Sequence, residues 1–206
     1  EAFARLCEQC GIPFCETQAG KGTLSWEHPL NLGGVGVTGG RAANALAPQA
    51  DVVLAVGTRL TDFTTCSKWL FAPDARFLSL NICPFDAVKY DGEPIVCDAR
   101  AGLEALAAAL RDYRAGWDER VAQARRSWLA EADAYYAQTA PQGLSQTRAL
   151  GEINRFLQKD DIAVGSAGSL PGDMQRLWRA GESGTYHMEY GFSNMGYEIN
   201  GALGVK

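Results

Sequence analysis

The sequence predicts an α/β protein in which parallel strands form a sheet covered by helices. Short apolar segments alternate along the 206 residues with helical patterns, and the clearest segment, 51–57, is apolar at consecutive positions. A strand that is apolar on both sides needs cover on both faces of its sheet, which is typical of parallel sheets with crossover helices. The balance of 47% hydrophobic and 21% charged residues fits an ordinary globular domain.

The part of the chain before residue 140 reads as one nearly complete α/β unit. Strands are expected at residues 12–17, 51–57, 76–82 and 94–98. Helices are expected at residues 43–46, 63–71, 103–113 and 116–138. The residues expected to bury the last two helices follow their apolar spacing and are Leu103, Leu106, Leu110, Trp117, Val121, Trp128 and Tyr135.

Residues 139–143, Thr-Ala-Pro-Gln-Gly, interrupt the helical pattern and are the best linker candidate. We therefore expect a central domain over residues 1–140 and the incomplete start of a second α/β domain over residues 141–206. Both ends of the chain read as the interior of a longer protein, because neither carries a boundary signal. The second part should contain a helix capped by Ser145 with Leu150, Ile153 and Leu157 on its apolar face, a strand at 161–165, a helix through Met174 and Trp178, a strand at 185–190 and a helix from Gly196.

Charge and cysteine content narrow the class of protein. The formal net charge is -5 and the basic residues are scattered, which argues against a nucleic-acid or membrane-surface partner. No apolar run is long enough to span a bilayer. The six cysteines are irregularly spaced, which is typical of reduced thiols in the cytoplasm. Cys7 and Cys10 form a C-x-x-C, but no second pair at zinc-ligand spacing exists, so two helix thiols are expected.

The segment 34–39, Gly-Val-Gly-Val-Thr-Gly, matches G-x-G-x-x-G and leaves two interpretations open. Dinucleotide binding needs a strand directly before the motif and an acidic residue at the end of the next strand. Residues 26–32 do not read as a strand, and the next strand ends Gly57-Thr58-Arg59 without an acid. A turn that lets backbone approach the start of a helix is therefore favoured over a nucleotide site.

Asp62 and the histidines offer little chemistry of their own. Asp62 follows the strand at 51–57, at the edge where open α/β sheets bind ligands, but it fits equally well as a helix N-cap. His28 and His187 are far apart in the sequence, without a serine nucleophile elbow or metal-ligand spacing between them. A structural role is expected for each histidine.

Two loops of small residues follow the strands at 161–165 and 185–190. The first, 165–173, contains Gly168, Ser169 and Leu170; the second, 191–196, contains Ser193, Asn194 and Met195. Small residues free backbone N–H groups to bind a phosphate, and the helix that follows adds its dipole. Neither loop contains Lys or Arg, so a metal would have to balance the charge. Loops at the ends of adjacent strands make one shared pocket plausible.

At these residues the chain resembles the thiamine diphosphate enzymes related to acetolactate synthase. Residues 16–22 and 28–34 are similar to the family pattern T-x-x-G-K-G … H-P-x-x-x-G, and residues 50–59 to A-D-x-V-x-x-x-G-x-R. The turn 191–196 is similar to the G-x-G-T-M-G cofactor turn. The resemblance implies a Rossmann-like central domain of the DHS-like NAD/FAD-binding type, followed by the truncated start of a thiamine diphosphate-binding domain.

The resemblance also implies which residues contact the cofactor. Gly168, Ser169 and Leu170 correspond to a loop along its diphosphate and thiazolium, and Ser193, Asn194 and Met195 to the turn beside its aminopyrimidine. The activating glutamate belongs to the family's N-terminal domain, so no catalytic residue is assigned in this chain. The Mg²⁺ ligands would follow Lys206, so no metal ligand is assigned either.

Within the family, one subfamily of hydrolases in inositol catabolism is most similar. It opens a cyclic diketone by hydrolysing a carbon–carbon bond, giving 5-deoxyglucuronate. The stretches that carry this similarity are 16–21, 58–65, 168–173 and 186–192. The resemblance implies a cytoplasmic homo-oligomer, dimer or tetramer, with a small-molecule substrate and an inactive chain when these residues stand alone. Alternatives are an acetolactate synthase-like carboligase and a nucleotide-binding regulatory module. Gly40 and Arg41 depart from the subfamily pattern.

Overall fold

All strand pairings in the computed structural model, which describes residues 1–206, are parallel, so the predicted α/β class is confirmed. The strands are β1 (Phe14–Glu16), β2 (Asn31–Gly34), β3 (Val52–Val56), β4 (Arg76–Asn81), β5 (Glu93–Val96), β6 (Ala163–Gly165) and β7 (Tyr186–Met188). They form separate sheets in the orders β1-β2, β3-β4-β5 and β6-β7. The strands of the first part therefore do not join into one continuous sheet.

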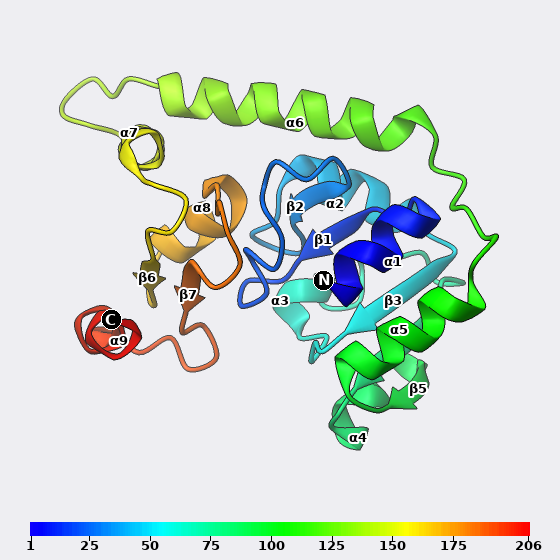
Figure 1. Cartoon of the computed structure of the whole chain (residues 1–206). Coiled ribbons are helices and arrows are strands. Elements are labelled where there is room, and N and C mark those ends of the chain that lie inside the picture. The colour runs from blue at the N-terminus through cyan, green and yellow to red at the C-terminus, as the bar shows by residue number, and fades with distance from the viewer.

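Helices connect and cover these strands. They are α1 (Ala2–Cys10), α2 (Arg41–Leu46), α3 (Asp62–Thr65), α4 (Pro84–Ala87), α5 (Ala99–Ala109), α6 (Glu119–Ala137), α7 (Gln146–Phe156), α8 (Leu170–Leu177) and α9 (Tyr197–Val205), with short 3₁₀ turns at Ala47–Gln49 and Lys89–Asp91. Figure 1 shows α6 lying along one side of the molecule, with α2 below it and α7 at its far end. None of these helices combines the length and apolar character that crossing a membrane requires.

Apolar side chains gather in separate clusters. The largest lies under α6, where Val121 and Trp128 pack against α2 and the segment around β2, as the helical spacing predicted. A second cluster joins α1 and α5 over β4 and contains Leu6, Leu80 and Leu103. A third surrounds α7, α8 and β7. Because α6 contacts both α2 and α7, it links the first part of the chain to the second.

The strand β2 contradicts the expectation that no strand precedes the glycine motif. Residues Asn31–Gly34 pair in parallel with β1, and Gly34 is both the last strand residue and the first glycine of the motif. The sequence Asn-Leu-Gly-Gly lacks the β-branched and aromatic residues that indicate strands. Pairing with β1 stabilises this strand, and pairing is a tertiary effect that local propensity does not report.

The helix expected at residues 63–71 is much shorter. It ends after Thr65, because Cys66, Ser67 and Lys68 adopt positive φ angles of 49°, 53° and 71°. Its N-cap is Thr61, whose side chain accepts the Thr64 N–H at 3.4 Å. The N-cap interpretation of Asp62 is therefore wrong, since Asp62 is the first helical residue.

One further cap and both departures from the subfamily pattern have clear physical causes. Ser145 caps α7 as predicted, accepting the Arg148 N–H at 3.2 Å. A Cβ at Gly40 would lie 2.7 Å from the Trp128 ring, so glycine at this position allows α6 to pack closely. The neighbouring Arg41 pairs with Glu131 of α6 at 3.1 Å. Both residues that depart from the subfamily pattern thus serve the contact between α2 and α6.

Candidate functional site

The two small-residue loops lie side by side at one sheet edge. β6 and β7 are parallel neighbours, with Gly165 opposite Met188, so the segments that follow both strands leave the sheet at the same end. The Ser166 hydroxyl donates to the Asn194 carbonyl at 2.7 Å, and Ser166 is only 1% exposed. The structure thus brings Gly168, Ser169 and Leu170 into the same region as Ser193, Asn194 and Met195.

The first loop is open and leads into a helix N-terminus. Gly168 adopts φ 89°, and no atom lies within 4 Å of the position that a Cβ would occupy. Leu170 then begins α8, so the positive end of the helix dipole faces this loop. The loop therefore has free space and faces a helix N-terminus, whose first turn also carries the Asp173 carboxylate.

The second loop is a tight turn held by a carboxylate. Glu189 accepts the backbone N–H groups of Phe192 and Asn194, each at 2.9 Å. The hydrogen bond from Phe192, and after it the one from Asn194, stabilise the ionised carboxylate and so lower the pKa of Glu189 below its ordinary value. Sequence reasoning missed Glu189; the available signal was an acidic residue two positions before the turn 191–196.

Met195 does not pack into the core. Its side chain is 90% exposed, and Phe192 in the same turn is also highly exposed. Methionine between a turn and a helix is usually buried, so an exposed one at a sheet edge is available for a ligand or another segment. The edge therefore offers an apolar surface beside an open, helix-ended loop, which fits one wall of a site for a ring-bearing phosphate ester.

A segment from the first part of the chain reaches this edge. The Phe63 ring, in α3, meets the Tyr190 ring edge-on with centroids 5.3 Å apart. The Arg59 Nη2 atom lies 4.0 Å from the place where Gly191 would carry a Cβ. The loop after β3 and the start of α3, where Asp62 is exposed, therefore border the turn.

The glycine motif at residues 34–39 packs closely against α3 and α8. A Cβ at Gly36 would lie 2.1 Å from the Phe63 carbonyl oxygen, and one at Gly34 2.8 Å from Gln175. The Val37 N–H also donates to the Phe63 carbonyl at 2.8 Å. Since α3 and α8 occupy the space that a dinucleotide pyrophosphate would need, the geometry favours the turn interpretation.

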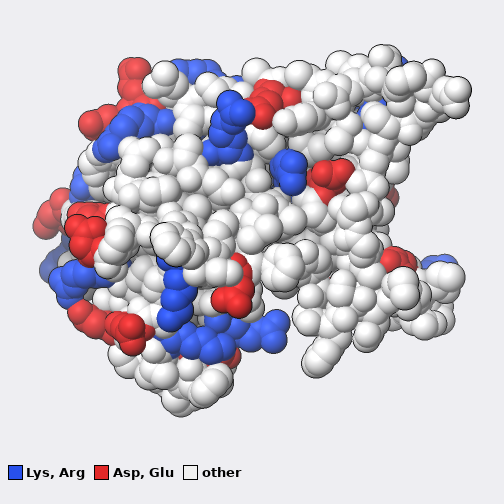
Figure 2. Space-filling view, turned by 180° about the vertical axis from the view of Figure 1, so that it is seen from behind, with Lys and Arg blue, Asp and Glu red and all other residues white.

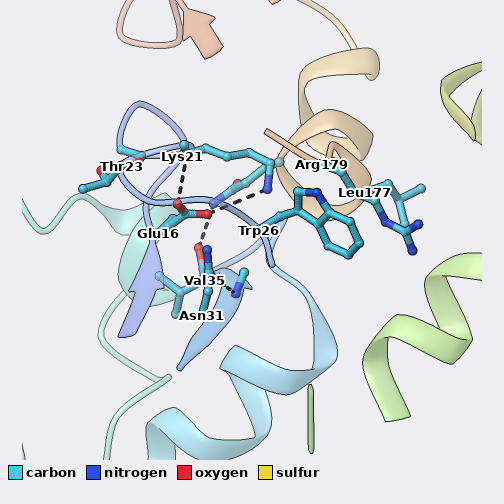
Figure 3. Close-up of polar contacts among 12 residues, drawn as sticks. Glu16, Lys21, Thr23, Trp26, Asn31, Val35, Leu177 and Arg179 are labelled. Atoms are coloured by element: carbon cyan, nitrogen blue, oxygen red, sulfur yellow. Dashed lines mark hydrogen bonds and ion pairs between the residues drawn. The ribbon is translucent and has the colours of Figure 1, made fainter. Parts of the chain in front are cut away.

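Glu16, at the end of β1, and Lys21, in the loop after it, form a buried ion pair (Figure 3). The Glu16 carboxylate accepts the Gly22 N–H at 2.9 Å, and its other oxygen lies 4.0 Å from the Lys21 Nζ atom. Both side chains are 4% exposed. Burial raises the pKa of Glu16 and lowers the pKa of Lys21. The motif around Lys21 was noticed in the sequence, but its role as a buried pair was not predicted.

Side chains from the same region hold α8 in place. Gln18 donates to the Pro171 carbonyl at 2.9 Å, and Gln175 donates to the Val35 carbonyl at 3.0 Å. Both bonds join the β1–β2 region to the helix that begins at the first candidate loop. The loop carrying Gly168 is therefore anchored from the first part of the chain.

The histidines and the C-x-x-C cysteines make local contacts. His28 pairs with Glu8 at 3.1 Å, and His187 bonds to the Gly184 carbonyl at 2.9 Å. Cys7 and Cys10 are free and buried in α1, and burial raises the pKa of Cys7 to about 12. No group of three or more His, Cys, Asp and Glu residues is placed to hold a metal ion.

Charges of both signs are distributed over the face seen in Figure 2. Figure 2 shows acidic and basic residues interspersed, with few charges on the side that carries α9. A cavity of about 630 Å³ lies away from the two loops, between α6, α7 and the segment that follows α8. Its charged lining is largely paired internally, as in Arg155 with Glu152 at 3.0 Å and Arg179 with Asp133 at 2.6 Å.

Proteins of known name are similar to this chain in sequence. A sequence profile described as the central domain of thiamine pyrophosphate enzymes matches residues 1–106. The chain is 46% identical over 229 positions to 3D-(3,5/4)-trihydroxycyclohexane-1,2-dione hydrolase of Geobacillus thermodenitrificans (strain NG80-2). Proteins of the same name from Clostridium tetani (strain Massachusetts / E88) and Bacillus anthracis (strain CDC 684 / NRRL 3495) are 42% and 43% identical over 233 positions. Each match covers 100% of this chain and 36% of the relative.

Proposed function

Because the chain belongs to the thiamine pyrophosphate enzyme family, we propose that it is part of a cytoplasmic hydrolase acting on 3D-(3,5/4)-trihydroxycyclohexane-1,2-dione. The intact enzyme would cleave a carbon–carbon bond of this cyclic diketone to give 5-deoxy-D-glucuronate in inositol catabolism. Identities of 42% to 46% along the whole chain to relatives of that name support the proposal. The chain spans 36% of their length, and in this proposal residues outside it would complete the enzyme.

Residues 1–140 serve in this proposal as the central domain and residues 141–206 as the start of the cofactor domain. The observation that carries the assignment is the hydrogen bond between Ser166 and Asn194, because it joins two loops that were expected separately to contact one cofactor. Thiamine diphosphate, when bound, supplies an electron sink for the carbon–carbon cleavage.

Each loop has a distinct task toward that cofactor. Gly168, Ser169 and Leu170 would present backbone N–H groups and the α8 dipole to the diphosphate. Ser193, Asn194 and Met195 would support the ring system with an apolar side chain on a fixed turn. Neither loop carries a cation, so a Mg²⁺ ion with ligands beyond Lys206 would balance the diphosphate charge.

Calorimetry tests this division of tasks. Thiamine diphosphate with Mg²⁺ is titrated into the 206-residue chain and into the full-length protein. We expect saturable binding only to the full-length protein, because the activating glutamate and metal ligands lie outside the chain. Tight binding to the chain alone would contradict the proposal.

A product assay separates the hydrolase from the alternative carboligase. The full-length protein is incubated with pyruvate or with the cyclic dione, and the products are identified by mass spectrometry. We expect ring opening of the dione and no acetolactate. If acetolactate were the main product, the hydrolase proposal would be wrong and the carboligase alternative would take its place.

The intact enzyme is also proposed to be a homo-oligomer. Ile199 and Leu203 on α9 are highly exposed, as is Met195 before it. Such an apolar area is normally covered by another segment or another subunit.

A further inference from the structure

We propose that Glu189 is a positioning residue that fixes the turn carrying Met195 in the shape required for cofactor binding; this inference rests on the proposed function. Glu189 directly follows β7, and its own N–H donates to the Gly165 carbonyl of β6 at 3.1 Å. Its backbone is therefore tied to the sheet, and its side chain reaches forward over the turn.

The Glu189 carboxylate accepts backbone N–H groups on both sides of Ser193, which has a strained backbone conformation. One oxygen accepts the N–H of Phe192 and the other that of Asn194, the residues before and after Ser193. Ser193 has φ 55°, in the left-handed region that residues with a Cβ disfavour. Hydrogen bonds to an ionised carboxylate are stronger than neutral ones, so they can hold Ser193 in this conformation.

Ser166 adds a second attachment to the backbone of the same residue, Asn194. Its buried hydroxyl donates to the Asn194 carbonyl at 2.7 Å, while the Asn194 N–H is held by Glu189. Met195 follows immediately, and with 90% of its surface exposed it has almost no packing of its own. The position of Met195 is therefore set by the backbone that Glu189 and Ser166 hold.

The hydrogen bonds to Glu189 also indicate which of the two loops can bind a phosphate. The N–H groups of Phe192 and Asn194 are already used, and a negative charge lies beside them. A phosphate at this turn would meet the carboxylate, whereas the loop at Gly168 is open and faces the α8 N-terminus. The turn thus takes the aminopyrimidine ring of the ligand rather than its diphosphate.

A double-mutant cycle in the full-length protein tests this inference. Glu189→Gln keeps the size of the side chain and removes its charge, and Glu182→Gln, at an exposed residue without a side-chain partner, is the matched control. We expect Glu189→Gln to raise the thiamine diphosphate Kd about tenfold, the loss typical of a charge-assisted bond. The control should leave the Kd unchanged.

Ser193→Gly completes the cycle, because glycine adopts a positive φ without a clamp. The increase in thiamine diphosphate Kd caused by Glu189→Gln should be several-fold smaller when Ser193 is also replaced by glycine. A second readout needs no cofactor: amide hydrogen exchange at residues 192–195 should be faster in Glu189→Gln than in the control.

The outcomes separate the two proposals. If the unmodified full-length protein does not bind thiamine diphosphate, the proposed function fails. If it binds, but Glu189→Gln matches Glu182→Gln in Kd and in exchange, or loses affinity equally in both Ser193 backgrounds, the positioning role of Glu189 is overturned.

Discussion

At the scale of single residues, buried charge dominates the first part of the chain. Glu16 and Lys21 are both nearly inaccessible, and the carboxylate gains a backbone N–H from Gly22 in addition to the ammonium. A buried pair of this kind adds little net stability, but removing one partner leaves an uncompensated charge in the interior. The G-K-G sequence therefore places a strong local constraint on the loop between β1 and β2.

Lys21→Met should destabilise the 206-residue chain by roughly 3–5 kcal/mol, because Glu16 is left buried without its cation. The double variant Glu16→Gln/Lys21→Met should recover most of this loss. Urea unfolding measures the difference, with Lys206→Met at the exposed C-terminal residue as control. Equal losses in Lys21→Met and Lys206→Met would contradict the role of the pair.

Glu16→Gln alone should make stability rise with pH. Burial already lowers the pKa of Lys21 from 10.5, and without the carboxylate that favours the charged form it falls further. Between the folded and unfolded pKa values the unfolded chain binds more protons, so raising the pH favours the folded state. Urea midpoints should therefore increase between about pH 7 and pH 10, more steeply than in the unmodified chain. A flat profile would rule out a buried ammonium.

At the scale of elements, close backbone contacts decide where segments begin and end. β2 forms although its sequence favours no strand, because β1 offers parallel partners. α3 stops after Thr65 because the next residues turn into the left-handed region. The glycine turn after β2 presses directly on α3, which couples the two segments.

Gly36→Ala should test that coupling. The new Cβ would lie 2.1 Å from the Phe63 oxygen, and Gly36 has φ 100°. Strain and overpacking together should cost about 2–4 kcal/mol. Gly116→Ala is the control, since no atom lies within 4 Å of its Cβ position, and it should change stability by about 0.5 kcal/mol or less. Thermal unfolding measures the stability of both variants. Similar losses in the two would show that α3 can move away from the new Cβ at little cost.

At the scale of the whole molecule, apolar surface remains uncovered where sheets end. β3 has the continuous apolar sequence of a central strand, yet it pairs only with β4, and Val52 is 47% exposed. Figure 1 shows α9 on the opposite side of the molecule from β3. Ile199 and Leu203 on α9 are highly exposed. Both surfaces are suited to contact with further protein.

The isolated chain should therefore self-associate as its concentration rises, because exposed apolar patches favour burial against each other. Ile199→Ser/Leu203→Ser should reduce this association about tenfold or more, as expected for removing two large apolar contacts. Sedimentation velocity measures the species, and Leu144→Ser serves as control at an exposed residue outside α9. A monomeric chain at all concentrations would oppose the prediction.

Local patterns were sufficient for much of the fold. The alternation of apolar runs and helical spacing predicted the parallel α/β class, the strands β3, β4 and β5, and the long helix α6 with Trp128 in its buried face. Ser145 was identified as a cap because capping depends on one side chain and its nearest N–H groups. The loops around Ser169 and Met195 were located because small residues after a strand are a local signal.

The sequence by itself thus determined the elements whose causes lie within a few residues. Only the tertiary structure decided that β2 exists, that β1 and β3 belong to separate sheets, that Glu16 pairs with Lys21, and that Glu189 and Ser166 hold one turn. Each of these depends on groups brought together from different segments or on the path of a turn. The hydrogen bonds and burial that stabilise them arise from that assembly, and no local pattern encodes their energies.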